Sequence, residues 1–176
     1  MINLTIMREI FFAGGCFWGT QHYLKQSNGV VNTEVGYANG HTSKPTYEQV
    51  YTDLTGHAEC VLVEYDPAII SLETLAELYF RSIDPTSLNK QGEDAGTRYR
   101  TGIDYTADED YHIIKKVFDR VAAMHNEPLA VEVGPLEYFY SAEEYHQDYL
   151  DKNPEGYCHI PLELMEMARR ANKEDK

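Results

Sequence analysis

The chain is poor in cysteine and contains no long apolar segment. Its three cysteines lie far apart among 176 residues and form no Cys-x-x-Cys pair, which excludes a disulfide framework. Arg8 and Glu9 shorten the apolar stretch near the start, so we expect no export signal. No stretch reaches the length of a membrane span. We therefore expect a protein of the reducing cytoplasm with no membrane association.

Basic residues are also scarce. Fifteen Lys and Arg stand against twenty-nine Asp and Glu, giving a net charge of −14. This balance argues against a nucleic-acid partner, because such binding relies on neutralising phosphates. Repeats, low-complexity tracts and flexible linkers are absent too. We expect a single catalytic domain over residues 1–176, with frayed ends at about 1–6 and 172–176.

Strand and helix patterns alternate along the chain, which predicts an α/β class. Residues 41–50 predict an ordered loop with one helical turn, and residues 84–100 form a long aperiodic stretch that predicts a functional loop. Two apparent capping boxes, at 106–109 and 141–144, predict helix starts. Expected strands are 9–13, 30–38, 57–65, 101–105, 131–133 and 138–140; expected helices are 17–26, 71–83, 106–124, 141–151 and 161–171.

The stretch Gly14–Gly19 contains a cysteine between an expected strand and an expected helix. A helix N-terminus stabilises an anion and can lower a thiol pKa from about 8.5 toward neutrality, which would make Cys16 a nucleophile. Phe17 and Trp18, the only tryptophan, would add aromatic walls beside it. A packed cysteine in a glycine turn is an equally common outcome, so this stretch alone leaves both interpretations open.

Alternation in residues 57–65 places Glu59 on one face with valines and Cys60 on the other. A carboxyl group on an apolar face should have a raised pKa and can serve as a proton donor. The alternative is a glutamate at a strand end that reaches solvent or pairs with His57, and alternation alone favours it. We expect Cys60 to be a packed core thiol.

Five ordered blocks resemble the peptide methionine sulfoxide reductase A family, which is specific for the S epimer of methionine sulfoxide. The resemblance covers nearly the whole chain, and the set of blocks is highly specific. The blocks are Gly15-Cys16-Phe17-Trp18-Gly19; Gly36-Tyr37 with Pro45-Thr46-Tyr47; Gly56-His57-Ala58-Glu59; Asn89 to Arg100; and Tyr145-His146-Gln147 with Gly156-Tyr157-Cys158.

The resemblance implies a two-layer α/β sandwich, a mixed sheet packed with helices and extensive surface coils. It also implies reduction of methionine-S-sulfoxide, free or in oxidised proteins, by a monomer without a bound cofactor or metal. The implied roles are Cys16 as nucleophile, Glu59 as acid, Tyr47 and Tyr99 as hydrogen-bond donors to the sulfoxide oxygen, Asp94 as polar support, and Phe17 and Trp18 as the methyl-binding walls.

Release of methionine would leave Cys16 as a sulfenic acid, which condenses with a second thiol. The resemblance makes Cys158 the resolving cysteine, while Cys60 is the competitor whose expected strand face points away. Thioredoxin, or dithiothreitol in vitro, would then reduce the disulfide. The chain departs from many relatives, which have Asn at the position of Glu93, Gln at that of Arg98 and Val at that of Cys60.

Two other functions remain open from the residues. A thiol peroxidase or general disulfide exchanger could use Cys16 and Cys158, although it would not need Glu59 and two tyrosines around one oxygen. A metal-binding or regulatory module could use both cysteines with His57 and His159, although the paired ligand spacing of zinc sites is absent.

Overall fold

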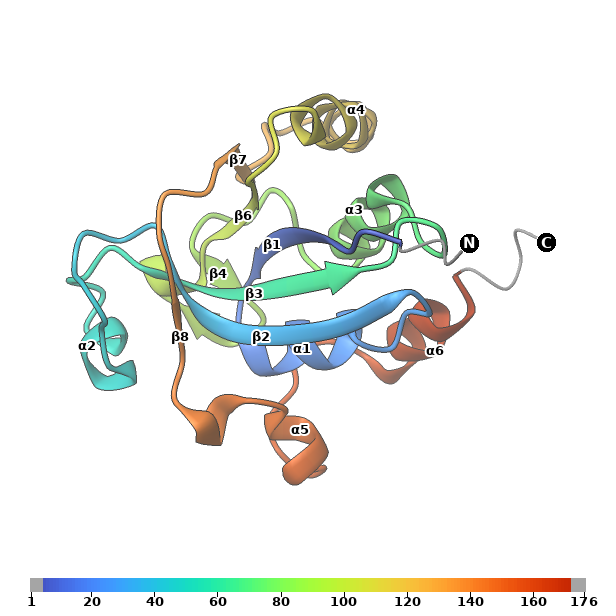
Figure 1. The fold of residues 1–176 in the computed structure, drawn as a ribbon. Helices are drawn as coiled ribbons and strands as arrows, with labels where there is room; N and C mark the ends of the chain where they lie inside the picture. Colours follow the sequence, from blue (N-terminus) through green and yellow to red (C-terminus); the bar gives the residue numbers. More distant parts are fainter. Residues whose placement is uncertain (1–4, 172–176) are drawn as a thin grey trace.

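The computed structural model describes residues 5–171, and a six-stranded sheet lies at its centre (Figure 1). The strand order is β7-β6-β1-β3-β2-β8, and all neighbours are antiparallel except β6 and β7. The sheet is therefore mixed, as expected. Its strands are β1 (Arg8–Gly14), β2 (Val30–Ala38), β3 (Ala58–Tyr65), β6 (Thr101–Tyr105), β7 (Glu132–Pro135) and β8 (Phe139–Ser141).

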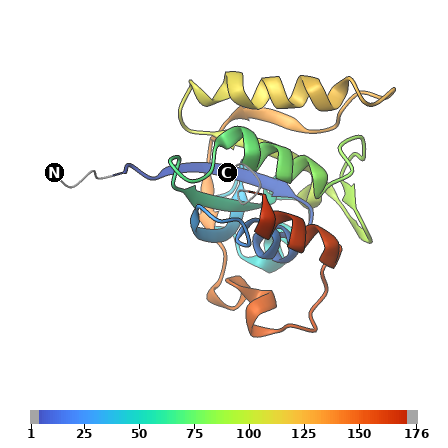
Figure 2. The same cartoon turned by 90° about the vertical axis from the view of Figure 1, so that its right-hand side faces the viewer.

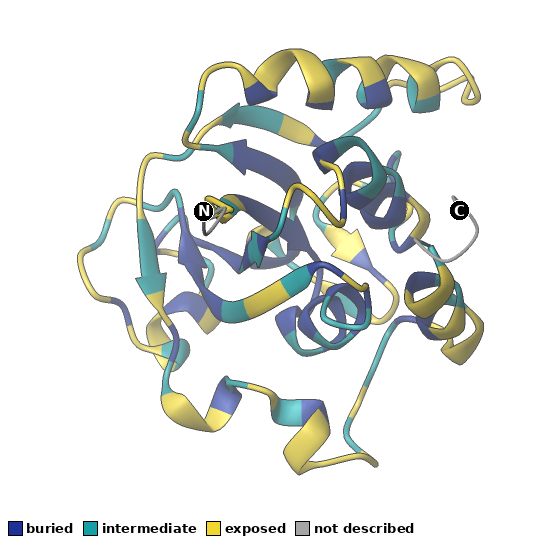
Figure 3. Ribbon diagram, turned by 45° about the vertical axis from the view of Figure 1, so that its right-hand side comes forward, coloured by how far each residue is buried: buried dark blue, intermediate teal, exposed yellow. Residues whose placement is uncertain are grey.

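The long helices cover one face of the sheet, where the main core forms (Figures 1 and 2). α3, α4 and α6 each bury an apolar stripe and leave a polar face to solvent, which is plain on α4 in Figure 3, whereas α1 is buried on nearly all sides. Tyr23 and Tyr79 are fully buried, and their hydroxyls donate to the carbonyls of Leu78 and Ala13. The long helices are α1 (Phe17–Leu24), α3 (Leu72–Arg81), α4 (Asp110–Ala122) and α6 (Leu162–Arg170).

Short elements occupy the ends and edges of the sheet. The stretch 84–100 is ordered and holds a two-stranded hairpin, and the expected helical turn within 41–50 exists with a capping box between Thr46 and Gln49. These elements are α2 (Tyr47–Tyr51), β4 (Lys90–Gln91), β5 (Asp94–Ala95), the 3-10 turns η1 (Thr97–Tyr99) and η2 (Glu144–His146), and α5 (Tyr149–Lys152).

A second, smaller core lies on the other face of the sheet. Cys60 is fully buried there with Phe11 and Ala38, and Leu136 and Phe139 cover them from the segment that leads into β8. Val61 and Val63 belong to the main core instead. The two-faced alternation predicted for this strand is therefore confirmed.

The expected helix at 141–151 is wrong. Ser141 ends β8, and only Glu144–His146 and Tyr149–Lys152 are helical. The Gln147 amide instead bonds both the N–H and the carbonyl of Val35, extending the edge of β2, and Asp148 is left-handed at φ 52°. These long-range hydrogen bonds override the local helix signal.

Two further expectations fail at element ends. The Thr106 hydroxyl bonds Glu9 rather than capping a helix, and α4 begins four residues later behind Glu109, which makes no side-chain cap. Gly134 and Pro135 lie inside β7 rather than interrupting strands.

Of the expected frayed ends, residues 1–4 and 172–176 fall outside the described residues. Within residues 5–171, no helix is both long and apolar enough to cross a bilayer.

Asp104 is a buried carboxyl on β6, and burial raises its pKa to about 7. Between the ordinary aspartate pKa and this value, the unfolded chain has lost a proton that the folded chain keeps, so stability falls as pH rises. Asp104→Asn should remove this contribution, about 1.4 kcal/mol for each pH unit of the window. Urea unfolding between pH 5 and 7 measures it, and an unchanged slope would contradict the assignment.

Candidate active site

Cys16 is the N-cap residue of α1, directly after the turn that leaves β1. Gly15 makes that turn at φ +86°, and a β-carbon there would lie 2.8 Å from the β-carbon of Gln91. Only glycine fits this conformation and this space. The Cys16 thiol is free and 7% exposed, so the turn directs the sulfur toward the interior.

Glu59 lies on β3 beside this turn and is 2% exposed. Its Oε1 accepts a hydrogen bond of 3.1 Å from the backbone N–H of Phe17. A pairing between Glu59 and His57 does not occur, because His57 Nδ1 accepts from Gly40 N and His57 Nε2 bonds the carbonyl of Thr42. The carboxyl is therefore turned toward the residue that follows the thiol.

Burial raises the pKa of Glu59 to about 8, against a smaller lowering by the Phe17 N–H. The group is therefore protonated at neutral pH. Burial also raises the pKa of Cys16 well above its usual range, and the nearby Glu59 charge adds to this. The expected lowering of the thiol pKa is wrong. The N–H groups of Trp18 and Gly19 at the helix start do lower it, but desolvation is the larger effect.

Two tyrosines reach the site from separate elements. Tyr47 begins α2, and burial followed by the Glu59 charge raises its pKa to about 12. Tyr99 ends η1, is 6% exposed and has its pKa raised by the same two causes. Both phenols therefore remain protonated hydrogen-bond donors. The Arg98 guanidinium lies 4.4 Å from the Tyr99 ring centroid and pairs with Asp53 at 2.6 Å, which fixes the ring.

Asp94 is half-buried on β5, in the hairpin opposite the Cys16 turn. Its Oδ2 is buried and has no hydrogen-bond partner among the described residues. Burial raises the pKa of Asp94, while His159 and Tyr157 lower it. Its charge in turn raises the pKa values of Cys16 and Glu59. Asp94 therefore acts on the electrostatics of both groups.

Trp18 is held in place on two sides. Its ring stacks on Tyr149 with centroids 3.7 Å apart at 10°, and its Nε1 donates to His146 Nδ1 at 3.0 Å. His146 is 1% exposed and also packs against Phe17 and Tyr47, with ring centroids 5.1 and 4.6 Å from its own. Sequence reasoning gave His146 no individual role, although it lies in one of the family blocks.

Cys158 lies in the coil between α5 and α6, half-buried, with its Sγ 3.5 Å from the carbonyl of Ile160. A β-carbon on Gly19 would lie 3.2 Å from that Sγ, so the thiol sits against the first turn of α1. Burial raises its pKa. A cavity of about 560 Å³ opens beside Cys158, with Leu150 and Met165 in its wall. Cys60, by contrast, lies in the smaller core on the other face of the sheet.

The structure thus brings Cys16, Phe17, Glu59, Tyr47 and Tyr99 together where the central strand β1 ends and the central strand β3 begins, with Asp94 nearby on β5. Within residues 5–171 no three His, Cys, Asp or Glu side chains are arranged to hold a metal ion. A buried thiol beside a protonated acid and two phenol donors on a mixed α/β sheet is the kind of site in which thiol chemistry can take place.

Comparison with known proteins identifies the family to which the chain belongs. Residues 8–176 match the family described as peptide methionine sulfoxide reductase. Peptide methionine sulfoxide reductase MsrA of Clostridium acetobutylicum is 54% identical over 159 residues, which cover 90% of this chain and 98% of that protein. The chain therefore belongs to the peptide methionine sulfoxide reductase family.

Solved structures agree. Mxr1 from Saccharomyces cerevisiae in reduced form superposes with a TM-score of 0.84 at 37% identity, covering 92% of this chain and 94% of that one. Mxr1 in complex with Trx2 superposes with a TM-score of 0.59 at 26% identity, covering 85% and 88%. The mixed sheet with packed helices is thus the fold of this family.

Proposed function

We propose that this protein reduces methionine-S-sulfoxide, free or within oxidised proteins, to methionine, and so repairs oxidised proteins. The observation that carries this proposal is the Glu59 carboxyl, which stays protonated up to about pH 8 and bonds the N–H next to Cys16. A nucleophile for the sulfoxide sulfur and an acid for its oxygen thereby lie side by side.

The Cys16 sulfur attacks the sulfoxide sulfur while Glu59 protonates the oxygen, and the thiol proton of Cys16 passes to the Glu59 carboxylate, which restores the acid. The oxygen passes to Cys16 as its bond to the substrate breaks, which gives methionine and a Cys16 sulfenic acid. The substrate sulfur gains two electrons and the Cys16 sulfur loses two. Protonation is required because a sulfoxide oxygen is a poor leaving group without it.

The surrounding side chains orient the substrate. Tyr47 and Tyr99 donate hydrogen bonds to the sulfoxide oxygen, and their raised pKa values keep them protonated. Phe17 and Trp18 receive the methyl group, and the fixed indole supports a constant geometry. Asp94 supplies the polar support.

Cys158 then condenses with the sulfenic acid, and thioredoxin reduces the resulting Cys16–Cys158 disulfide. Access from the cavity beside Cys158 supports attack at this sulfur. Residues 1–176 act as one catalytic domain, as a monomer in the cytoplasm, with no bound cofactor.

The decisive experiment is product analysis on the two separated sulfoxide epimers with dithiothreitol as reductant. We expect methionine from the S epimer and none from the R epimer. Equal turnover of both epimers would overturn the proposed specificity. Turnover of hydrogen peroxide with no methionine formed would favour the thiol peroxidase.

Cys158→Ser should release one methionine per enzyme and then stop with thioredoxin, because the sulfenic acid has no resolving thiol. Methionine counting by chromatography, with and without thioredoxin and its reductase, measures both stages. Continued thioredoxin-dependent turnover would remove Cys158 from this role.

A further inference from the structure

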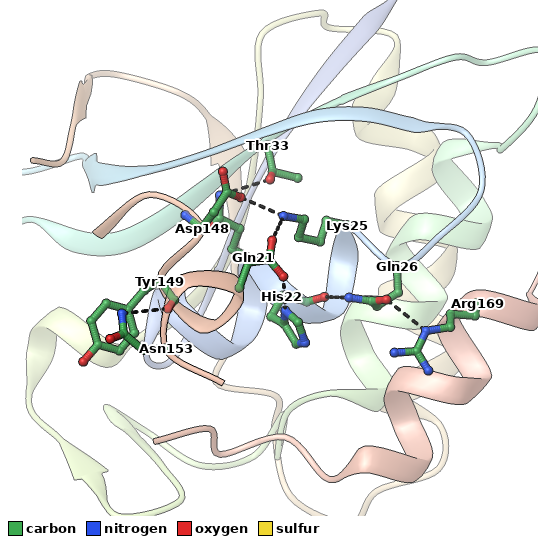
Figure 4. A network of polar contacts seen from close by, with 10 residues as sticks. Gln21, His22, Lys25, Gln26, Thr33, Asp148, Tyr149, Asn153 and Arg169 are labelled. Atoms are coloured by element: carbon green, nitrogen blue, oxygen red, sulfur yellow. Dashed lines mark hydrogen bonds and ion pairs between the residues drawn. The ribbon is translucent and has the colours of Figure 1, made fainter. Parts of the chain in front are cut away.

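Polar contacts link the segments before and after the coil that carries Cys158, residues 153–161, to α1 and the two residues that follow it (Figure 4). Before the coil, Asp148 receives the ammonium of Lys25 at 2.8 Å, and its backbone N–H donates to Gln21 Oε1 at 3.0 Å. After the coil, Arg169 Nε donates to Gln26 Oε1 at 3.0 Å. The elements on either side of the coil, α5 and α6, are therefore anchored near the end of α1.

His159 provides a third attachment inside the coil. Its Nε2 lies 2.9 Å from the carbonyl oxygen of Gly14. A carbonyl only accepts hydrogen bonds, so Nε2 must carry the proton, and in the neutral ring Nδ1 must then carry a lone pair. This Nδ1 is buried and has no hydrogen-bond partner among the described residues. A free basic nitrogen thus lies next to the second cysteine.

Gly19 brings this nitrogen and the Cys158 thiol to the same place. A β-carbon on Gly19 would lie 2.9 Å from His159 Nδ1 and 3.2 Å from Cys158 Sγ. Both atoms can approach the first turn of α1 only because Gly19 lacks a side chain. The two atoms therefore lie no more than about 6 Å apart beside the first turn of α1, and the Cys158 thiol, which bonds the Ile160 carbonyl, needs only to rotate or to use one bridging water to reach Nδ1.

We propose that His159 is the general base of the resolving step: its Nδ1 takes the proton of the Cys158 thiol, directly or through one water, as Cys158 attacks the Cys16 sulfenic acid. The new bond joins the two sulfurs, and the sulfur–oxygen bond of the sulfenic acid breaks. Hydroxide leaves and takes the proton from His159 as water. The Cys16 sulfur is reduced and the Cys158 sulfur is oxidised.

The surroundings explain why a base is needed and why His159 can serve. Burial raises the pKa of Cys158, so little thiolate forms unaided at neutral pH. Burial lowers the pKa of His159, with Asp94 acting in the opposite direction, so the ring is neutral there. The other titratable groups around the pair are Cys16 and His22 on the α1 side, Glu93 on the hairpin, Tyr157 in the coil and Asp151 at the edge of the cavity.

The inference rests on the proposed function and is tested by His159→Gln. The glutamine amide can keep the donor to Gly14, but it has no basic nitrogen. Enzyme is mixed with methionine-S-sulfoxide without reductant, and samples are quenched over time. Methionine release and loss of the second thiol are then counted in the same samples between pH 5.5 and 9.5.

We expect disulfide formation in His159→Gln to be about 100-fold slower than in wild type at pH 7. The difference should narrow toward the alkaline end of the pH range, as a growing fraction of Cys158 ionises without a base. Equal rates at pH 7 would overturn the proposal. A slowing by the same factor at every pH would assign His159 to positioning and would overturn its role as a base.

Two controls make the result specific. His112→Gln places the same substitution at an exposed histidine of α4 and should leave the disulfide rate unchanged. Wild type alone supplies a second test, because its disulfide rate should level off above a midpoint below pH 6.5 rather than continue to rise toward pH 9. Absence of methionine release from wild type would contradict the proposed function itself, whereas normal release with a pH-independent effect contradicts only the role of His159.

Discussion

Cys16→Ser should form no detectable methionine from methionine-S-sulfoxide, even when enzyme is supplied in stoichiometric amounts. A hydroxyl at this buried N-cap position is a far weaker nucleophile than a thiol and cannot form a sulfenic acid. Stoichiometric assays with dithiothreitol, followed by chromatography of free methionine, measure this directly. A single equivalent of methionine from Cys16→Ser would show that another thiol attacks the substrate.

Cys60→Ala is the matched control for this experiment. Cys60 is fully buried on the opposite face of the sheet, so its removal should leave methionine formation and thioredoxin recycling intact. Circular dichroism of both variants checks that they are folded. Loss of recycling in Cys60→Ala would transfer the resolving role to that residue.

Glu59→Gln should lower kcat/KM by about 10²- to 10⁴-fold near neutral pH, because an amide cannot protonate the departing oxygen. Wild-type kcat/KM should also fall as pH rises above about 8, where Glu59 loses its proton. This descending limb should be absent from the residual activity of the variant. A wild-type rate in Glu59→Gln would remove Glu59 as the acid.

Glu64→Gln tests whether the loss is specific to that position. Glu64 lies on the same strand but faces the other side of the sheet and is half-buried near Asn32. The substitution should leave kcat/KM and its pH dependence unchanged. Equal losses in both variants would indicate a general effect of replacing a carboxyl group on β3.

The sheet strands and their faces could be predicted from the sequence because they follow from a local rule. Alternation in residues 58–65 separates Val61 from Cys60, and burial on two sides fixes that register. The long helices follow from apolar periodicity in the same way. Only the ends of these elements differ from the expected ones. There, side chains expected to cap a helix bond residues distant in the sequence, as Thr106 does with Glu9.

Long-range contacts set the features that could not be predicted. Ser141–Glu144 reads as a helix start, yet Glu143 instead accepts from the Tyr37 hydroxyl and from the backbone N–H of Tyr47. The pKa of Cys16 depends on how deeply three separate elements bury it, and no local pattern contains that information. His146 likewise gains its contact with Trp18 only through folding.

Cys16 and its aromatic neighbours follow from their place between an expected strand and an expected helix, whereas the roles of Tyr47, Asp94, Tyr99 and Cys158 come from the family blocks. Alternation favoured a solvent-facing or paired Glu59, and folding places it at the Phe17 N–H instead. The structure brings these separate blocks together, while the chemical roles of the residues await the experiments above.

The position of Cys60 has a consequence for oxidative folding. Three cysteines allow three pairings, but Cys60 is fully buried in the small core, whereas Cys158 packs against the main core on the other face of the sheet. The sheet thus separates the Cys60 thiol from Cys158 and hinders thiol–disulfide exchange between them. We therefore expect Cys60 to stay reduced in the folded protein when Cys16 and Cys158 are oxidised.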